Sequence, residues 1–175
     1  MKLQEVSPAA GGGLRRSDVI GRSLNLVLNN SMQAVTDGRR AIEAHVAPLA
    51  LSPMVLNRLE VVFEELISNI VRHGFTPGSS QMILVRVEAS SDAIELVIED
   101  DGEPFNLLEA PAPPPLQSLE SARLGGLGIV AVRKMAAEIR YDGFAPGAAS
   151  RLIDGRPFNP RNRVSLSIVG GQLKS

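Results

Sequence analysis

The stretch from Pro53 to Gly74, PMVLNRLEVVFEELISNIVRHG, decides the fold because its apolar residues recur with the period of a long amphipathic helix. Ser52 supplies a hydroxyl that can cap this helix, and Pro53 suits its first position, where no N–H is needed. Gly74 marks the end. At about 100° per residue, one arc carries the side chains that we expect in the core: Val55, Leu59, Val62, Phe63, Leu66, Ile67 and Ile70.

The polar residues of this helix divide between two faces. Glu65, Asn69 and His73 follow one another one turn apart along a margin of the apolar arc, so they can point together into a groove. The same spacing fits an ordinary polar border, so a functional interpretation needs partners elsewhere in the chain. The solvent side is expected to carry Asn57, Glu60, Glu64, Ser68 and Arg72.

Working outward, the chain shows strands and helices in groups and no strict alternation of the two. This order predicts an α+β fold, a two-layer sandwich, in place of repeated parallel units. The expected strands are Ser23 to Leu28, Met82 to Glu88, Ala93 to Asp100, Ile139 to Tyr141 and Arg163 to Val169, and the further helices are Met32 to Val46 and Ile129 to Ala137.

Three segments lack a periodic pattern. Residues 1–21, with a Gly-Gly-Gly run, are expected to form a flexible tail, which leaves residues 22–175 as one domain. Residues 103–124 are rich in proline and are expected to form a long loop, which at this length is usually either a functional lid or disordered. Residues 142–162 hold several prolines and glycines and are expected to be an irregular excursion.

Composition excludes several classes of function. The 18 Lys and Arg residues balance 19 Asp and Glu residues, and only 3% of residues are aromatic, so we expect no nucleic acid partner. The chain has no Cys and two His, so any metal must be held by oxygen ligands. No apolar run approaches the roughly 18 residues of a membrane helix, and the beginning of the chain does not resemble a signal peptide. We therefore expect a cytoplasmic protein without membrane contact.

Asp100 is the first candidate partner of the polar row. It shares one face of its strand with Ile94, Leu96 and Ile98, so its carboxylate is in phase with the core. A buried carboxylate needs hydrogen-bond donors, which solvent at the strand end or the exocyclic amine of a purine could supply. Gly102 follows, where glycine permits an unusual φ and lets a flat ligand approach the backbone.

The second candidate partner is the run Gly125-Gly126-Leu127-Gly128 at a helix start. Small residues there expose the free N–H groups of the first turn, which with the helix dipole suit a phosphate. The run is not a P-loop, because no Gly-Lys-Ser/Thr follows. It is not a dinucleotide fingerprint either, because a Pro-rich loop precedes it.

Together, Glu65-x-x-x-Asn69-x-x-x-His73-Gly74, Asp100-x-Gly102 and Gly125-Gly126-Leu127-Gly128-Ile129 resemble the N, G1 and G2 boxes of the GHKL ATP-binding superfamily. The segment His73-Gly74-Phe75 is most similar to the anti-sigma-factor serine kinases. The resemblance extends from about Ser23 to Val169. It implies a Bergerat-type fold, with a mostly antiparallel sheet of four to five strands, helices on one face, and ATP between the helix layer and the lid.

The resemblance also implies roles for individual residues. Asn69 would coordinate Mg²⁺, Asp100 would accept the adenine amine, and Glu65 would act as the base toward the attacking hydroxyl. His73 is expected to be structural. Gly102 would pack near the base, and Gly125, Gly126 and Gly128 would wrap the phosphates. Two contacts stay open: Arg123 is either a γ-phosphate ligand or a solvated side chain, and Ser165 either replaces a hydroxyl that relatives place near the phosphates or makes no contact.

The function that this resemblance implies is a protein serine/threonine kinase that phosphorylates a small anti-anti-sigma (STAS-like) partner. A sigma factor as a second partner and a homodimer are also expected. One alternative is a nucleotide-dependent binding module that transfers no phosphate. Another is the ATP-binding domain of a histidine kinase, which is disfavoured because His45 is too close to the helix of Glu65 to be a phosphoacceptor on a preceding dimerisation helix.

Overall fold

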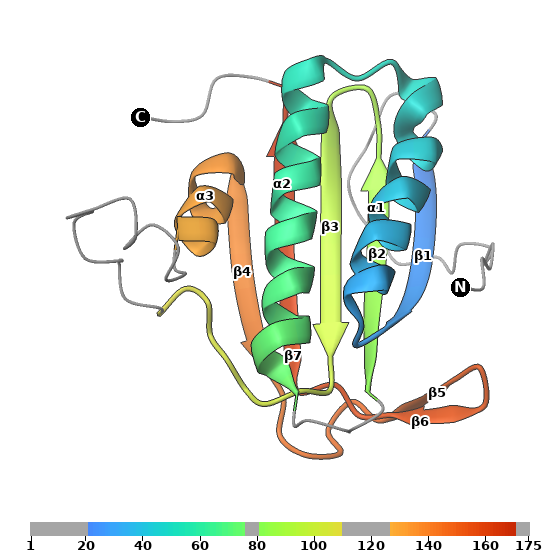
Figure 1. Cartoon of the computed structure of the whole chain (residues 1–175), viewed down its shortest axis with the longest axis vertical. Helices are drawn as coiled ribbons and strands as arrows, with labels where there is room; N and C mark the ends of the chain where they lie inside the picture. The colour runs from blue at the N-terminus through green and yellow to red at the C-terminus, as the bar shows by residue number, and fades with distance from the viewer. Residues whose placement is uncertain (1–20, 76–80, 110–126, 171–175) are drawn as a thin grey trace, which may run out of the picture.

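A computed structural model describes residues 21–75, 81–109 and 127–170. Within them, five strands form one antiparallel sheet in the order β1-β2-β3-β7-β4. The helices lie over one face of this sheet (Figure 1), so the α+β two-layer prediction is confirmed. The sheet strands are β1 (Arg22–Asn29), β2 (Met82–Ala89), β3 (Ala93–Asp100), β4 (Glu138–Gly143) and β7 (Asn162–Val169), and the helices are α1 (Met32–Val46), α2 (Pro53–Asn69) and α3 (Leu127–Met135), with a 3₁₀ turn η1 (Ala47–Leu49) after α1.

The two long helices begin at side-chain caps. The Ser31 hydroxyl accepts a hydrogen bond from the Ala34 amide at 3.1 Å, and the Ser52 hydroxyl accepts one from the Val55 amide at 3.3 Å. The cap at Ser52 and the proline after it therefore begin α2 where the sequence predicts. None of the helices in the described ranges combines the length and the apolar content needed to cross a membrane.

The apolar arc of α2 forms the centre of the core. Six of its seven expected members are buried, and Ile70 is half-buried. Ser68 was expected on the solvent side and is buried instead, with its hydroxyl donating to the Glu65 carbonyl oxygen at 3.4 Å. The reason is that α2 lies between α1 and α3 (Figure 1), so neighbours cover a wider arc than a single apolar face requires.

The end of α2 differs from the expected regular helix through His73. The α-helix stops at Asn69, and Ile70–Gly74 forms a π-helical turn, η2. A π turn holds more residues than an α turn, so residues after Asn69 no longer keep the four-residue phase. His73 is exposed and leaves the row of Glu65 and Asn69. Gly74 ends the helical segment, as predicted.

Residues 142–162 were expected to be irregular, but they contain a β-hairpin of β5 (Arg151–Ile153) and β6 (Arg156–Phe158). Asp154 and Gly155, both with positive φ, form its tight turn. Phe158 is fully buried, and the Arg151 guanidinium lies 4.9 Å from the centre of its ring. The hairpin is therefore a packed element at the end of the sheet (Figure 1).

An ion-pair cluster fastens this hairpin to the sheet. Glu99 of β3 is 8% exposed and pairs with Arg151 of the hairpin and with Arg163 of β7, whose Nη2 lies 2.7 Å from Oε1. Arg163 also lies over the ring of Phe144, 5.0 Å from its centre. Because Glu99 precedes Asp100 on the strand, these pairs occupy the face opposite to the helices.

Replacing Phe158 with alanine tests whether the hairpin is part of the folded core. Phe158→Ala should lower the free energy of unfolding by roughly 3–5 kcal/mol, because it removes a buried ring and leaves a cavity. Leu152→Ala, on the same hairpin but 70% exposed, should change it by less than about 0.5 kcal/mol. Denaturant unfolding of both variants measures the difference. Equal effects would mean that the hairpin is not packed as described.

Candidate functional site

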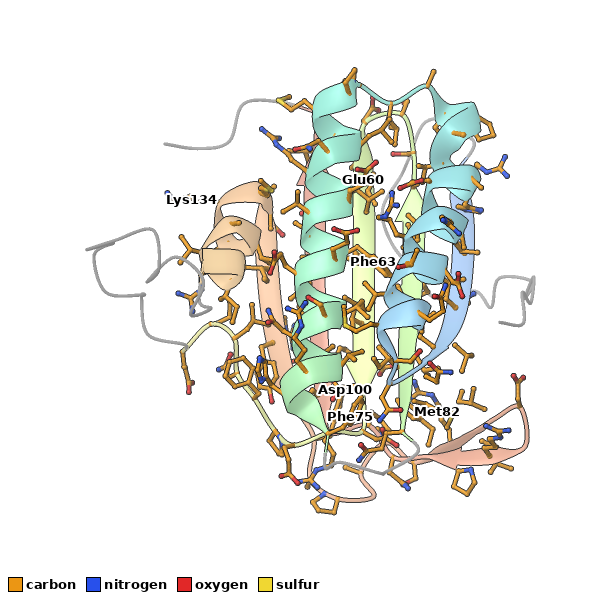
Figure 2. All side chains as sticks on the ribbon, viewed as in Figure 1. Glu60, Phe63, Phe75, Met82, Asp100 and Lys134 are labelled. Atoms are coloured by element: carbon orange, nitrogen blue, oxygen red, sulfur yellow. The ribbon has the colours of Figure 1, made fainter. Side chains whose placement is uncertain are left out.

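The candidate site lies at the end of the sheet where α2 stops. Asp100, at the end of β3, and Phe75, just after the π turn, both lie there (Figure 2). The first turn of α3 approaches α2 close to Glu65. The topology therefore brings together parts of all three motifs that the sequence analysis singles out.

Asp100 is buried, with 4% of its surface exposed. Its Oδ1 accepts hydrogen bonds from the Gly102 amide and from Nδ2 of Asn162, both at 2.9 Å. Burial raises the pKa of this carboxyl to about 6, and the Asp101 charge adds to the rise, while the two donors oppose it. Both donors are neutral, so Asp100 is a strong acceptor held in place without a cation.

Glycine is needed at position 102 for a different reason from the one expected. The glycines with positive φ among the described residues are Gly147 and Gly155, so the expected unusual φ at Gly102 is wrong. A Cβ at Gly102 would collide with the Gly74 carbonyl oxygen and lie 2.9 Å from Oδ1 of Asp100. The Glu103 amide donates to that same Gly74 oxygen at 2.8 Å. Glycine is required because two backbone segments meet here.

Asn162, at the start of β7, is a member of the site that the sequence analysis missed. It is 5% exposed and pairs with Asp100 in the register of β3 and β7. A signal was present, since Asn162 is in phase with Val164, Leu166 and Ile168 by the same alternation that marked Asp100. A buried amide at a strand end needs partners as a buried carboxylate does.

Glu65 is half-buried and faces the first turn of α3. A Cβ at Gly128 would overlap the Glu65 carboxylate, with its Cδ 2.6 Å away, so only glycine leaves room for this contact. The N-terminal turn of a helix favours a negative charge. Glu64 instead is exposed and pairs with Arg39, Nε to Oε1 at 3.0 Å. The two neighbouring glutamates thus point in different directions, as the helix phase predicts.

Asn69 is the half-buried last residue of α2, one turn after Glu65. Across the described part of the chain, no three His, Cys, Asp or Glu side chains come close enough to hold a metal ion. Mg²⁺ at nucleotide sites is commonly held by one or two protein oxygens together with substrate phosphates. An amide oxygen at Asn69 fits that mode of binding, whereas a metal site made by protein side chains alone does not fit these residues.

Some expected members of the site are not brought to this cluster. Ser165 lies on the other face of β7, in register with Val97 and Arg140, because the inward positions of that strand begin at Asn162. The side chains of Ser165 and Asp100 therefore lie on opposite faces of the sheet. Arg123, Gly125 and Gly126 lie outside the described residues, as do residues 1–20.

The first part of the expected lid, residues 103–109, is described and is held to the domain. We call this segment the lid base. Leu107 is 3% exposed and joins the core, and Arg133 of α3 donates to its carbonyl oxygen. Phe105 is 54% exposed, but its amide donates to Oδ1 of Asn162 at 3.0 Å. The lid base therefore contacts both β7 and α3.

Replacing Gly102 with alanine tests the close approach at the heart of the site. Gly102→Ala should lower the free energy of unfolding by about 1–3 kcal/mol, the usual cost of inserting an atom where no space exists, because the Gly74 carbonyl is backbone and cannot swing away. Gly21→Ala is a matched control, since its Cβ would lie at an ordinary contact distance of 3.9 Å from the Ala89 carbonyl oxygen. Thermal or denaturant unfolding measures both. A neutral Gly102→Ala would mean that the two segments do not meet.

Comparison with known proteins agrees with this geometry. Residues 28–151 match the family described as histidine kinase-like ATPase domain. Serine/threonine-protein kinase BtrW of Bordetella bronchiseptica is 31% identical to the chain over 83 residues, which cover 47% of this chain and 58% of that protein. The matched part thus spans little more than half of that relative. Because the family match covers more than half of the chain and includes α2, β3 and α3, the protein belongs to the histidine kinase-like ATPase domain family, as the sequence motifs predict.

Proposed function

We propose that this protein is an ATP-dependent protein serine/threonine kinase that phosphorylates a small anti-anti-sigma (STAS-like) protein. Family membership supports ATP as the nucleotide, and the name of the related BtrW kinase supports a serine or threonine acceptor. The observation that carries the proposal is the position of Glu65, which points to the α3 N-terminus while its neighbour Glu64 points to solvent. A module that only bound nucleotide would not need a carboxylate there.

Nucleotide recognition is assigned to Asp100 and Asn69. Oδ1 of Asp100 already accepts two protein hydrogen bonds, so Oδ2 is the oxygen that we assign to the adenine amine. Asn69, at the end of α2, would hold Mg²⁺ through its amide oxygen, and the ion would neutralise charge on the phosphates. The glycine at position 128 leaves the first turn of α3 open toward Glu65.

In the proposed reaction, Glu65 accepts the proton of the partner's serine or threonine hydroxyl. That oxygen forms a bond to the γ-phosphorus, the bond between the γ-phosphorus and the bridging oxygen breaks, and ADP leaves. Glu65 lies near the end of α2, and its carboxylate lies against Gly128 in the first turn of α3. The base and an anion-binding helix end are therefore adjacent, as transfer to a hydroxyl requires.

Replacing Asp100 with asparagine tests nucleotide recognition. Asp100→Asn retains an oxygen for the Gly102 and Asn162 donors but turns Oδ2 into a donor that opposes the adenine amine. ATP affinity should fall by about one to two decades, equivalent to roughly 1–3 kcal/mol. Calorimetry with ATP and Mg²⁺ measures this loss, and unchanged affinity would remove Asp100 from the site.

The difference in ATP affinity between the wild type and Asp100→Asn should also depend on pH. The pKa of Asp100 is raised to about 6, so its carboxylate is lost as the pH falls through about 6, and with it the stronger acceptor. The ratio of wild-type to Asp100→Asn affinity should therefore shrink below about pH 6, whereas titration of ATP itself cancels in the ratio. A ratio that stays constant from pH 8 to pH 5 would contradict the assignment.

Replacing Glu65 with glutamine tests catalysis. Glu65→Gln keeps size and hydrogen-bonding shape but removes the base, so phosphoryl transfer to the partner should fall by about 10²- to 10⁴-fold with little change in ATP binding. Glu64→Gln is the control on the neighbouring position, and its exposed ion pair with Arg39 contributes little. Transfer of labelled phosphate measures both. Equal losses would contradict the assigned role, and nucleotide-dependent partner binding without transfer in the wild type would favour the non-catalytic binding module.

A further inference from the structure

We propose that Asn162 is the positioning residue that couples base recognition by Asp100 to the lid base, residues 103–109. The inference deepens the proposed function and rests on it for the identity of the nucleotide. Asn162 is buried, belongs to none of the three motifs, and contacts both Asp100 and the lid base. Its side-chain amide therefore both orients Asp100 and holds the lid base in place.

All four hydrogen-bonding positions of the Asn162 amide are used. Nδ2 donates to Oδ1 of Asp100 at 2.9 Å and to the Glu103 carbonyl oxygen at 3.1 Å. Oδ1 accepts from the Phe105 amide at 3.0 Å and from the Tyr141 hydroxyl at 2.7 Å. One buried amide thus joins β3, β4, β7 and the lid base, and such satisfied networks rigidify the groups they connect.

The lid base fixes which way this amide points. The Phe105 amide can only donate and the Glu103 carbonyl can only accept, so the backbone of the lid base allows one orientation of Asn162. In that orientation the NH₂ group must face Asp100. Rotating the amide by half a turn would place its oxygen against both the Glu103 carbonyl and the carboxylate. When the lid base makes these two contacts, the NH₂ group of Asn162 is therefore oriented to donate to Asp100.

The Nδ2 group of Asn162 acts on Asp100 in two ways. It occupies Oδ1 together with the Gly102 amide, which leaves Oδ2 for a ligand. It also opposes the rise in pKa that burial causes, so removing it raises the pKa of Asp100 further above about 6. An Asp100 protonated near neutral pH is a weaker acceptor for the adenine amine.

Other groups around Asp100 do not replace this effect. Asp101 raises the pKa of Asp100 further through its charge. Burial and the Asp100 charge both raise the pKa of Tyr141 from its usual value near 10, so its hydroxyl stays protonated throughout the range of interest, and Glu109 and Arg161 act on it with opposite signs. Arg161 meets Asp100 through its backbone amide, 2.8 Å from the Asp100 carbonyl oxygen.

Three variants of the full chain separate the two functions of Asn162. Asn162→Ala removes the donor and the acceptor. Asn162→Asp is isosteric, keeps an acceptor for Phe105 and Tyr141, and replaces the donor with a second carboxylate beside Asp100. Ser167→Ala lies on the outer face of the same strand and is the control.

Two measurements on the nucleotide-free protein give the first result. In Asn162→Ala, amide exchange of Phe105 should accelerate at least about tenfold, and NMR titration of the Asp100 carboxyl should shift upward by about one to two pH units, the equivalent of one hydrogen bond to a charged group. In Asn162→Asp, exchange at Phe105 should stay slow, whereas the paired carboxyls should titrate with a raised apparent pKa. Ser167→Ala should match the wild type in both.

ATP affinity gives the second result. With Asn162→Ala, the loss relative to the wild type should be larger at pH 6.5 than at pH 9, because Asp100 ionises again at high pH. A loss of equal size at both pH values would show a merely structural role and overturn the proposal, as would unchanged titration of Asp100 or unchanged exchange at Phe105 in Asn162→Ala. If the wild type binds no ATP while both nucleotide-free measurements shift as expected, the proposed function fails and the coupling through Asn162 stands.

Discussion

The hydrogen bonds of the buried Asp100 carboxylate are the constraint on which this end of the molecule depends. A buried anion is costly unless donors surround it, and both donors here are neutral groups of the chain. Each donor brings its own segment: the Gly102 amide holds the start of the lid base, and Asn162 holds the start of β7. Because Gly102 also meets the Gly74 carbonyl, the end of the long helix is fixed by the same contacts.

Glycines make the other close contacts of the helix layer. Gly38 of α1 faces Phe63 of α2, where a Cβ would lie 2.8 Å from Cζ, and Phe63 lies between these two helices (Figure 2). Gly128 of α3 faces Glu65 in the same manner. A missing side chain on one helix thus makes room for a larger side chain on its neighbour. These glycines are explained by space, since neither requires a positive φ.

The sequence was sufficient to predict what periodicity controls. The phase of α2 separates Glu65 from Glu64, and the alternation of β3 places Asp100 inward, because both depend on local geometry alone. Contacts between segments far apart in the sequence could not be predicted in this way, and the approach of Gly74 to Gly102 has no local signal. The contact of Ser165 was left open, whereas the alternation of β7 places Asn162 on the inner face and Ser165 on the outer one. The π turn at Ile70–Gly74 also has no signal in the helix pattern, and it removes His73 from the row of Glu65 and Asn69. The Asp154-Gly155 pair is a typical hairpin-turn dipeptide, but the prolines on both sides of it favour irregular structure and weaken the strand pattern.

The pairing of Asp100 with Asn162 has a consequence for how the protein is made. The two residues are 62 positions apart in the chain, and β7 inserts between β3 and β4, which both precede it. A ribosome must therefore release the last sheet strand before the carboxylate gains its amide partner and before the centre of the sheet is complete. Contacts this distant in sequence form late and slowly. During synthesis, the exposed edges of β3 and β4 are vulnerable to wrong pairing, and the hydrogen bond between Asp100 and Asn162 can form only once β7 has paired with β3.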